Sequence, residues 1–159
     1  MLTKKIKNLQ ELRRITAKLR SKGHKVVFTN GCFDILHYGH VALLDDSKNK
    51  GDVLIVGINS DASARAIKGP GRPLNNQLDR AMVLAALTCV DYVTIFNERT
   101  PERVINVLRP DVLVKGGDWK PKDIVGSIFV RSYGGKVARI PIRKGRSTTT
   151  LIKKIRNRY

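Results

Sequence analysis

The chain has 159 residues, 42% apolar and 6% aromatic, which is typical of one globular domain with a single core. Lysine plus arginine outnumber aspartate plus glutamate 31 to 13, and the net charge of +18 favours polyanionic partners. No apolar run approaches the roughly 18 residues of a membrane span, and the N-terminus lacks a signal-peptide core, so we expect a cytoplasmic protein with no membrane partner. Cys32 and Cys89 match no metal or redox spacing and are predicted to be reduced thiols.

The first half of the chain alternates helix and strand patterns. Residues 8–22 have an apolar period near 3.6, a capping-box pair in Asn8 and Glu11, and a stop at Gly23, which predicts an amphipathic helix. The β-branched run at 25–30 and the apolar run at 52–60 predict buried strands. A helix over 38–50 lies between them and makes a βαβ unit.

The second half continues the alternation. Helices are predicted after the second strand at 61–67, then at 77–88, from Thr100-Pro101 onward, at 121–133 and at 147–157, with strands at 91–96, 111–115 and 136–140. Five short strands separated by helices predict an α/β fold, an open parallel sheet with helices on both faces, because parallel neighbours need crossover connections. Glycine, proline and two flanking cations make 68–73 the most loop-like segment.

Ligands of open parallel sheets bind beyond the carboxyl ends of the strands, which directs attention to the residues after each strand. Four segments there carry chemistry: 29–40, 59–61, 115–119 and 143–150. The first holds His37 and His40, three residues apart at the start of a helix, so that both imidazoles share a helix face. A phosphate site fits this pattern, since imidazole and helix N-terminal N–H groups both donate to phosphate. Two alternatives remain: the histidines could be purely structural, or, with less support, they could bind a metal. We assign no metal ligands, because no third clear ligand is present.

The run FTNGCFDILHYGH resembles the signature of the HxGH nucleotidyltransferase superfamily. The chain is more narrowly similar to the D-glycero-β-D-manno-heptose 1-phosphate adenylyltransferases of lipopolysaccharide precursor synthesis. The likeness covers residues 25–157 and includes NSDAS at 59–63, KGPGRPL at 68–74, KGGDW at 115–119 and GRSTT at 145–149. The glycerol-3-phosphate cytidylyltransferases share HxGH and STT, but they carry GTFD where this chain has NGCFD, and they lack KGGD.

The resemblance implies a Rossmann-like single nucleotidyltransferase domain over 1–159 and the direct transfer of AMP from ATP to heptose 1-phosphate, with Mg²⁺ screening the phosphates. His37, His40 and Lys68 would act in catalysis. The residues expected to bind the nucleotide are Asn30, Gly31, Cys32, Phe33, Gly39, Arg80, Lys115, Gly117, Asp118, Ser147, Thr148 and Thr149. Asp34, Asn59, Asp61 and Arg72 are expected to bind the acceptor.

Several of these residues also have structural interpretations. Lys68 and Arg72 could belong to a solvated basic loop, Arg80 to a solvated helix face, and Asp61 could merely cap the helix that it begins. Cys32 has no implied base beside it, so we expect it to pack rather than to act as a nucleophile. Glycine pairs after strands are often only turns, and one hydroxyl of Ser147-Thr148-Thr149 serves as a helix cap.

Two features depart from the family pattern. Related cytidylyltransferases have RTxG before STT, whereas this chain has Ile142-Arg143-Lys144-Gly145, which leaves Arg143 and Arg146 as alternatives for the phosphate contact. Many heptose adenylyltransferases are fused to a sugar kinase, so we expect a separate heptose kinase to supply the acceptor here. A homo-oligomer is left open.

The charge also suggests a nucleic-acid-binding protein. However, the basic residues are spread over the whole chain, and no recognition-helix, RRM, KH or OB pattern is present. We therefore expect no specific nucleic-acid partner.

Overall fold

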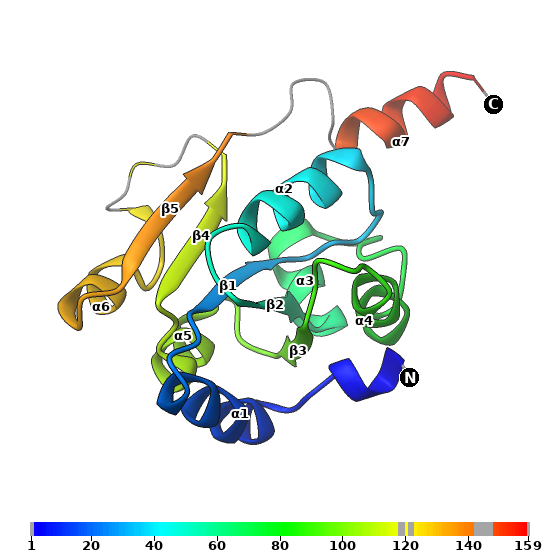
Figure 1. Cartoon of the computed structure of the whole chain (residues 1–159). Helices are drawn as coiled ribbons and strands as arrows, with labels where there is room; N and C mark the ends of the chain where they lie inside the picture. Colours follow the sequence, from blue (N-terminus) through cyan, green and yellow to red (C-terminus); the bar gives the residue numbers. More distant parts are fainter. Residues whose placement is uncertain (1, 118–119, 121–122, 142–147, 159) are drawn as a thin grey trace.

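Five short strands form one parallel sheet in the computed structural model, which describes residues 2–117, 120, 123–141 and 148–158 (Figure 1). The strands are β1 (Val26–Gly31), β2 (Val53–Asn59), β3 (Tyr92–Phe96), β4 (Val112–Gly116) and β5 (Lys136–Ile140). Their order across the sheet is β3-β2-β1-β4-β5, and every pair is parallel. This confirms the predicted open parallel sheet of a Rossmann-like α/β fold.

Helices connect the strands. They are the 3₁₀ helix η1 (Leu2–Lys5) and the α-helices α1 (Leu9–Ser21), α2 (Tyr38–Lys48), α3 (Asp61–Lys68), α4 (Gln77–Ala85), α5 (Glu102–Leu108), α6 (Ser127–Ser132) and α7 (Thr148–Arg156). In the part of the chain that the structure describes, none of them is long and apolar enough to cross a bilayer.

The sheet is covered on both faces because its central strands are apolar on both sides. Val27, Leu54 and Val56 belong to one core, together with side chains of α2 and α4. Val26, Phe28 and Ile55 alternate with them and face a second core with α1, α5 and α6. Figure 1 shows α1 and α5 on one side of the strands and α2 on the other. Burial on both faces explains why the central strands do not alternate apolar with polar residues in the sequence.

The ends of the first helix follow the sequence signals closely. Asn8 Oδ1 accepts a hydrogen bond from the Glu11 amide at 2.9 Å, and Glu11 Oε2 accepts one from the Asn8 amide at 3.0 Å, so the predicted capping box is confirmed. Gly23 adopts φ +79°, a left-handed conformation that favours glycine, and it ends the helix as predicted.

Three helix boundaries differ from the prediction. The helix expected over 121–133 is only α6, because Gly126 with φ +81° interrupts the chain just before it; residues 121–122 lie outside the described part. Helix α5 begins at Glu102 with Pro101 at its N-cap, so Thr100 is not the capping residue. Helix α4 ends at Ala85 instead of 88, where Leu87 turns back to the carbonyl of Leu84.

Candidate active site

The strand order reverses direction at β1, which pairs with β2 on one side and β4 on the other. The loops that follow β1 and β4 therefore border the topological switch point, where open α/β sheets bind ligands. A cavity of about 80 Å³ lies at these strand ends, and its polar lining includes Asn30, Lys115 and Asp123. Two of these three residues were predicted from sequence. Asp123 was missed because nothing in its local pattern marks it.

The two histidines of the HxGH run lie together at the start of α2. His37 is the N-cap residue, and its carbonyl accepts hydrogen bonds from the amides of His40 and Val41. The two imidazole rings stack with centroids 3.8 Å apart, and the ring of Phe33 lies 5.2 Å from that of His40. The N-cap side chain makes no capping hydrogen bond, so the helix start is not closed by its own cap.

Burial sets the charge of His40. Desolvation, aided by the neighbouring His37, lowers the pKa of His40 from 6.5 to about 4. Its imidazole is therefore neutral at pH 7, with one nitrogen that donates and one that accepts. The buried Nδ1 atom has no hydrogen-bond partner among the described residues. A neutral ring in this position is suited to donating a hydrogen bond to an anion.

Asp34 holds the glycine- and proline-rich loop against the site. Its Oδ1 accepts hydrogen bonds from the amides of Leu74 and Asn75 at 2.8 and 3.0 Å, and its carbonyl accepts one from the Asn75 side chain. Its Oδ2 lies 2.8 Å from Arg72 Nε in an ion pair. Asp34 is 5% exposed. Two of the four residues predicted to bind the acceptor, Asp34 and Arg72, thus contact each other in this structure.

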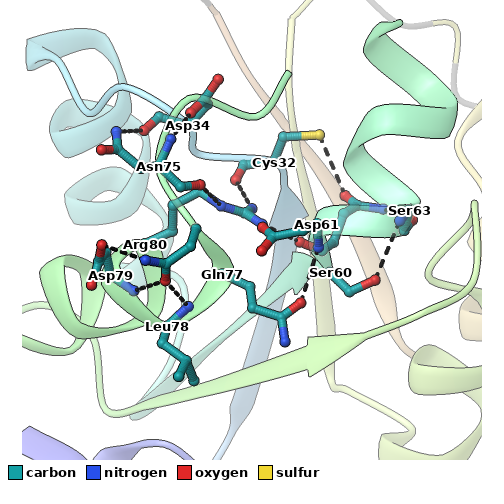
Figure 2. A network of polar contacts seen from close by, with 12 residues as sticks. Cys32, Asp34, Ser60, Asp61, Ser63, Asn75, Gln77, Leu78, Asp79 and Arg80 are labelled. Atoms are coloured by element: carbon teal, nitrogen blue, oxygen red, sulfur yellow. Dashed lines mark hydrogen bonds and ion pairs between the residues drawn. The ribbon is translucent and has the colours of Figure 1, made fainter. Parts of the chain in front are cut away.

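Arg80 is buried, which excludes a solvated helix face for this residue. Its guanidinium donates to the carbonyl oxygens of Cys32, Asn59 and Asn75 and to the carboxylate of Asp61 (Figure 2). These partners come from the loop after β1, from the end of β2 and the start of α3, and from the segment before α4. The sequence indicated an arginine near the site, but it did not indicate these contacts.

Asp61 is not the helix cap that its position allowed. Ser60 is the N-cap of α3, with its side chain accepting from the amide of Ser63. Asp61 pairs with Arg80 at 2.8 Å, and its amide donates to Gln77 at 3.0 Å (Figure 2). The Asn59 side chain donates to Ser63 Oγ at 2.9 Å.

Cys32 lies in the same network without the properties of a nucleophile. Its thiol contacts Asn59 Oδ1 at 3.7 Å, and burial raises its pKa although Lys68, Arg80 and Arg72 oppose this effect. A thiol with a raised pKa is mainly protonated at neutral pH. The structure therefore favours packing for Cys32.

Two lysines bring positive charge to the switch point. Burial lowers the pKa of Lys115 at the end of β4, and the Lys68 ammonium lowers it further. The charge of Lys68 also opposes the rise in the pKa of the Cys32 thiol. The exposed Lys68 side chain therefore lies within electrostatic range of both Lys115 and Cys32. Gly117 follows with φ +110°, and its amide donates to the carbonyl of Ile140, which joins the ends of β4 and β5. Asp118 lies outside the described residues.

The start of α7 reaches the loop before α2. Thr148 Oγ1 donates to the carbonyl of Ile35 at 3.4 Å, although 113 residues separate them, while Thr149 is exposed. Two helix N-termini, those of α2 and α7, are thereby brought to the same end of the sheet (Figure 1). Ser147, Arg143 and Arg146 lie outside the described residues.

The chain is similar in sequence to known proteins along nearly all of its length. Bifunctional protein HldE of Syntrophotalea carbinolica is 52% identical over 98% of this chain, and that of Geobacter metallireducens is 54% identical over 98%. The chain covers 32% of each of these proteins, so it spans about a third of the length of the curated relatives it matches.

Solved structures show the same fold. A lipopolysaccharide core biosynthesis protein from Thermoplasma volcanium GSS1 has 27% identity and a TM-score of 0.63, with 77% of this chain and 98% of that chain covered. A pantoate-beta-alanine ligase from Francisella tularensis has 18% identity and a TM-score of 0.62, with 94% and 72% covered, a likeness of fold alone. The cytidylyltransferase-like family matches residues 28–154. With this match and relatives above 50% identity along nearly all of its length, the chain belongs to the cytidylyltransferase-like family.

Proposed function

We propose that the protein transfers AMP from ATP to D-glycero-β-D-manno-heptose 1-phosphate, which gives ADP-heptose for lipopolysaccharide core synthesis and releases pyrophosphate. The stacked imidazoles of His37 and His40 at the N-terminus of α2, beside the switch point, carry the proposal of nucleotidyl transfer. The identity to HldE proteins and the likeness to a lipopolysaccharide core biosynthesis protein support the choice of substrate.

The proposed reaction is a direct displacement. An oxygen of the sugar phosphate attacks the α-phosphorus of ATP and forms a new P–O bond. The bond from that phosphorus to the oxygen bridging to the β-phosphate breaks, and its electron pair leaves with pyrophosphate. No covalent enzyme intermediate is needed, so the protein contributes positioning and stabilisation of charge.

His37 and His40 are proposed to donate hydrogen bonds to the α-phosphate as its charge grows. The lowered pKa of His40 supports an imidazole that is neutral at pH 7 and offers one N–H donor to an anion. The first turn of α2 adds the positive end of the helix dipole, which attracts anions. Glycine at position 39 leaves room for an approaching phosphate.

The β- and γ-phosphates are proposed to lie between Lys68 and the start of α7. Lys68 is exposed, and its charge acts on both the Cys32 thiol and the Lys115 ammonium. Thr148 and Thr149 supply hydroxyls at a helix N-terminus, beside the loop that leads into α2. The backbone near Gly31 and Phe33 and the segment after β4 are proposed to hold the nucleoside.

Mg²⁺ is proposed to enter with ATP. The described residues hold no group of three or more histidine, cysteine, aspartate or glutamate side chains that could form a metal cage. We therefore propose that the ion is bound mainly through the substrate phosphates and water, as Mg²⁺ usually is in nucleotide-dependent enzymes. When bound, the ion screens the phosphate charges.

The kinase reaction that supplies heptose 1-phosphate is proposed to lie outside these 159 residues. The curated relatives are called bifunctional, and this chain matches about a third of their length. We also propose that the protein is located in the cytoplasm, where ATP is available. That it forms a homo-oligomer stays a prediction.

A pyrophosphate-release screen tests the substrate assignment. Each common nucleoside triphosphate is combined with heptose 1-phosphate, glycerol 3-phosphate, FMN or phosphopantetheine. We expect release with ATP and heptose 1-phosphate, and its loss in a His37→Ala, His40→Ala double variant, which guards against a contaminating enzyme. Activity only with another acceptor would overturn the assignment.

A further inference from the structure

Arg80 is among the largest fully buried side chains, and its guanidinium is 0% exposed. It donates to the carbonyl oxygens of Asn75 at 3.0 Å, Asn59 at 2.9 Å and Cys32, and to Asp61 Oδ1 at 2.8 Å. A guanidinium has five N–H donors and no acceptor. These four hydrogen bonds, together with complete burial, leave no face of Arg80 for a phosphate.

The network explains why a charge is tolerated here. An unpaired buried cation is strongly disfavoured, and Asp61 supplies the opposite charge while three backbone carbonyls accept hydrogen bonds from three further donors. Figure 2 shows Arg80 between Cys32, Asp61 and Asn75, which come from separate segments of the chain. One side chain thus ties together the loop that follows β1, the junction of β2 with α3, and the segment leading into α4.

A chain of contacts runs from Arg80 to the imidazoles. The carbonyl that Arg80 holds belongs to Cys32, and the next residue, Phe33, has φ +47°. This left-handed conformation is unfavourable for a residue with a large side chain and persists only when its surroundings enforce it. The Phe33 ring is buried, and a Cβ atom at Gly31 would lie 3.0 Å from it, so only glycine fits there without a shift.

The ring of Phe33 then contacts His40, which stacks on His37. Arg80 therefore fixes the Cys32 peptide, that peptide fixes the backbone of Phe33, and the ring of Phe33 limits the rotation of His40. A phosphate contact for Arg80, which the family resemblance implies, does not fit these contacts.

We propose that Arg80 is a positioning residue that holds Phe33 in its left-handed conformation and thereby orients the imidazoles of His40 and His37. The inference rests on the proposed nucleotidyl transfer for its catalytic consequence. Its structural content, the link from Arg80 to the imidazoles, is measurable without any turnover.

The test compares Arg80→Lys with a matched control, Arg20→Lys. Arg20 also donates to backbone carbonyls, those of Leu108 and Arg109, but it lies in α1 and contacts no site loop. The chain has three histidines, and His24 is exposed, so the imidazole resonances can be assigned with single His→Gln variants and His24 serves as an internal reference.

We expect Arg80→Lys to shift the His40 and His37 resonances and to leave His24 unchanged, while Arg20→Lys moves none of them. In turnover assays, kcat of Arg80→Lys should fall by roughly 10- to 100-fold, as for a small misplacement of catalytic groups. Its affinities for a non-hydrolysable ATP analogue and for AMP should change by the same factor. If the wild-type protein showed no turnover with any substrate, the proposed function would be contradicted. The test of the link by the His37 and His40 resonances would still stand.

Two results would overturn the inference. One is a folded Arg80→Lys protein with unshifted His37 and His40 resonances. The other is a loss of affinity for the ATP analogue with none for AMP, since that pattern marks a contact to the outer phosphates. If Arg80→Lys does not fold, Phe33→Leu tests the second part of the link, from the Phe33 ring to His40, with Arg80 in place. The His40 resonance should then shift, and an unchanged resonance would contradict the proposal.

Discussion

His40 combines burial, neutrality and a position at a helix start. Desolvation and His37 lower its pKa to about 4, while the helix N-terminus beside it attracts anions. In the proposed transfer, His40 therefore meets the phosphate as a neutral donor, without a full positive charge of its own.

Removing one imidazole tests this role. His40→Ala should lower kcat by on the order of 10²- to 10³-fold, because loss of one donor to transition-state charge has this effect. Steady-state kinetics with ATP and heptose 1-phosphate measures it, and urea unfolding checks that the variant is folded. Turnover near the wild-type rate in the folded variant would rule out the proposed part played by His40.

The lowered pKa of His40 also predicts how stability depends on pH. The unfolded chain protonates this imidazole below about 6.5, and the folded chain resists until about 4, so His40 makes the free energy of unfolding decrease as pH falls through that window. His40→Gln lacks this term. Its stability should therefore fall less than that of the wild type between about pH 7.5 and about pH 5, by urea denaturation.

A matched variant separates this effect from general acid sensitivity. His24→Gln removes an exposed imidazole and should follow the wild-type curve. If His40→Gln loses as much stability as the wild type across the same window, His40 is not held neutral by the fold.

The spacing of His37 and His40 was enough to predict a shared helix face, because residues three apart on a helix are neighbours. The burial of Arg80 was not predictable from local pattern. Its partners Cys32 and Asn59 lie 48 and 21 residues away and offer backbone carbonyls, which every residue type carries. The ion pair of Asp34 with Arg72 was not predictable either, because it depends on how the loop that carries Arg72 folds back.

At the scale of elements, prediction succeeded where local chemistry decides. The strands follow continuous apolar runs bounded by turns, and the first helix has both of its end signals. Prediction was wrong over 121–133, where helix-like composition hid the left-handed Gly126. It also gave no sign of η1, whose following residue Ile6 bridges to Val93 and whose Lys5 donates to the carbonyls of Leu87 and Val90. Contacts over such sequence distances leave no local pattern.

The start of α7 carries a prediction of its own. Thr148 lies beside the loop leading into α2, and helix N-terminal amides and hydroxyls suit the outer phosphates of ATP. The double variant Ser147→Ala, Thr148→Ala should bind a non-hydrolysable ATP analogue more weakly and AMP about as well as the wild type. Calorimetry measures both, and affinity for heptose 1-phosphate should barely change.

An equal loss for the ATP analogue and AMP would assign the α7 start to the nucleoside pocket or to folding. As a control within the helix, Lys153→Ala removes a charge from an exposed position on α7 and should weaken both ligands equally and slightly.

At the scale of the whole molecule, the net charge of +18 raises the local concentration of any polyanion. Weak DNA or RNA binding should follow, without sequence selectivity and lost at high salt, because distributed lysine and arginine are enough to attract phosphates. Fluorescence anisotropy at several salt concentrations measures it. Tight, sequence-selective binding at physiological salt would favour the nucleic-acid alternative.

The sheet, its switch point and the converging helix starts of α2 and α7 together support the proposed transfer of AMP to a sugar phosphate. The most direct measurement offers ATP and CTP at equal concentration together with heptose 1-phosphate and identifies the nucleotide sugar by mass spectrometry. The account predicts ADP-heptose as the main product, formed with an equal amount of pyrophosphate. A preference for CDP-heptose, or no nucleotide sugar from a folded protein that does react with another phosphorylated alcohol, would contradict it.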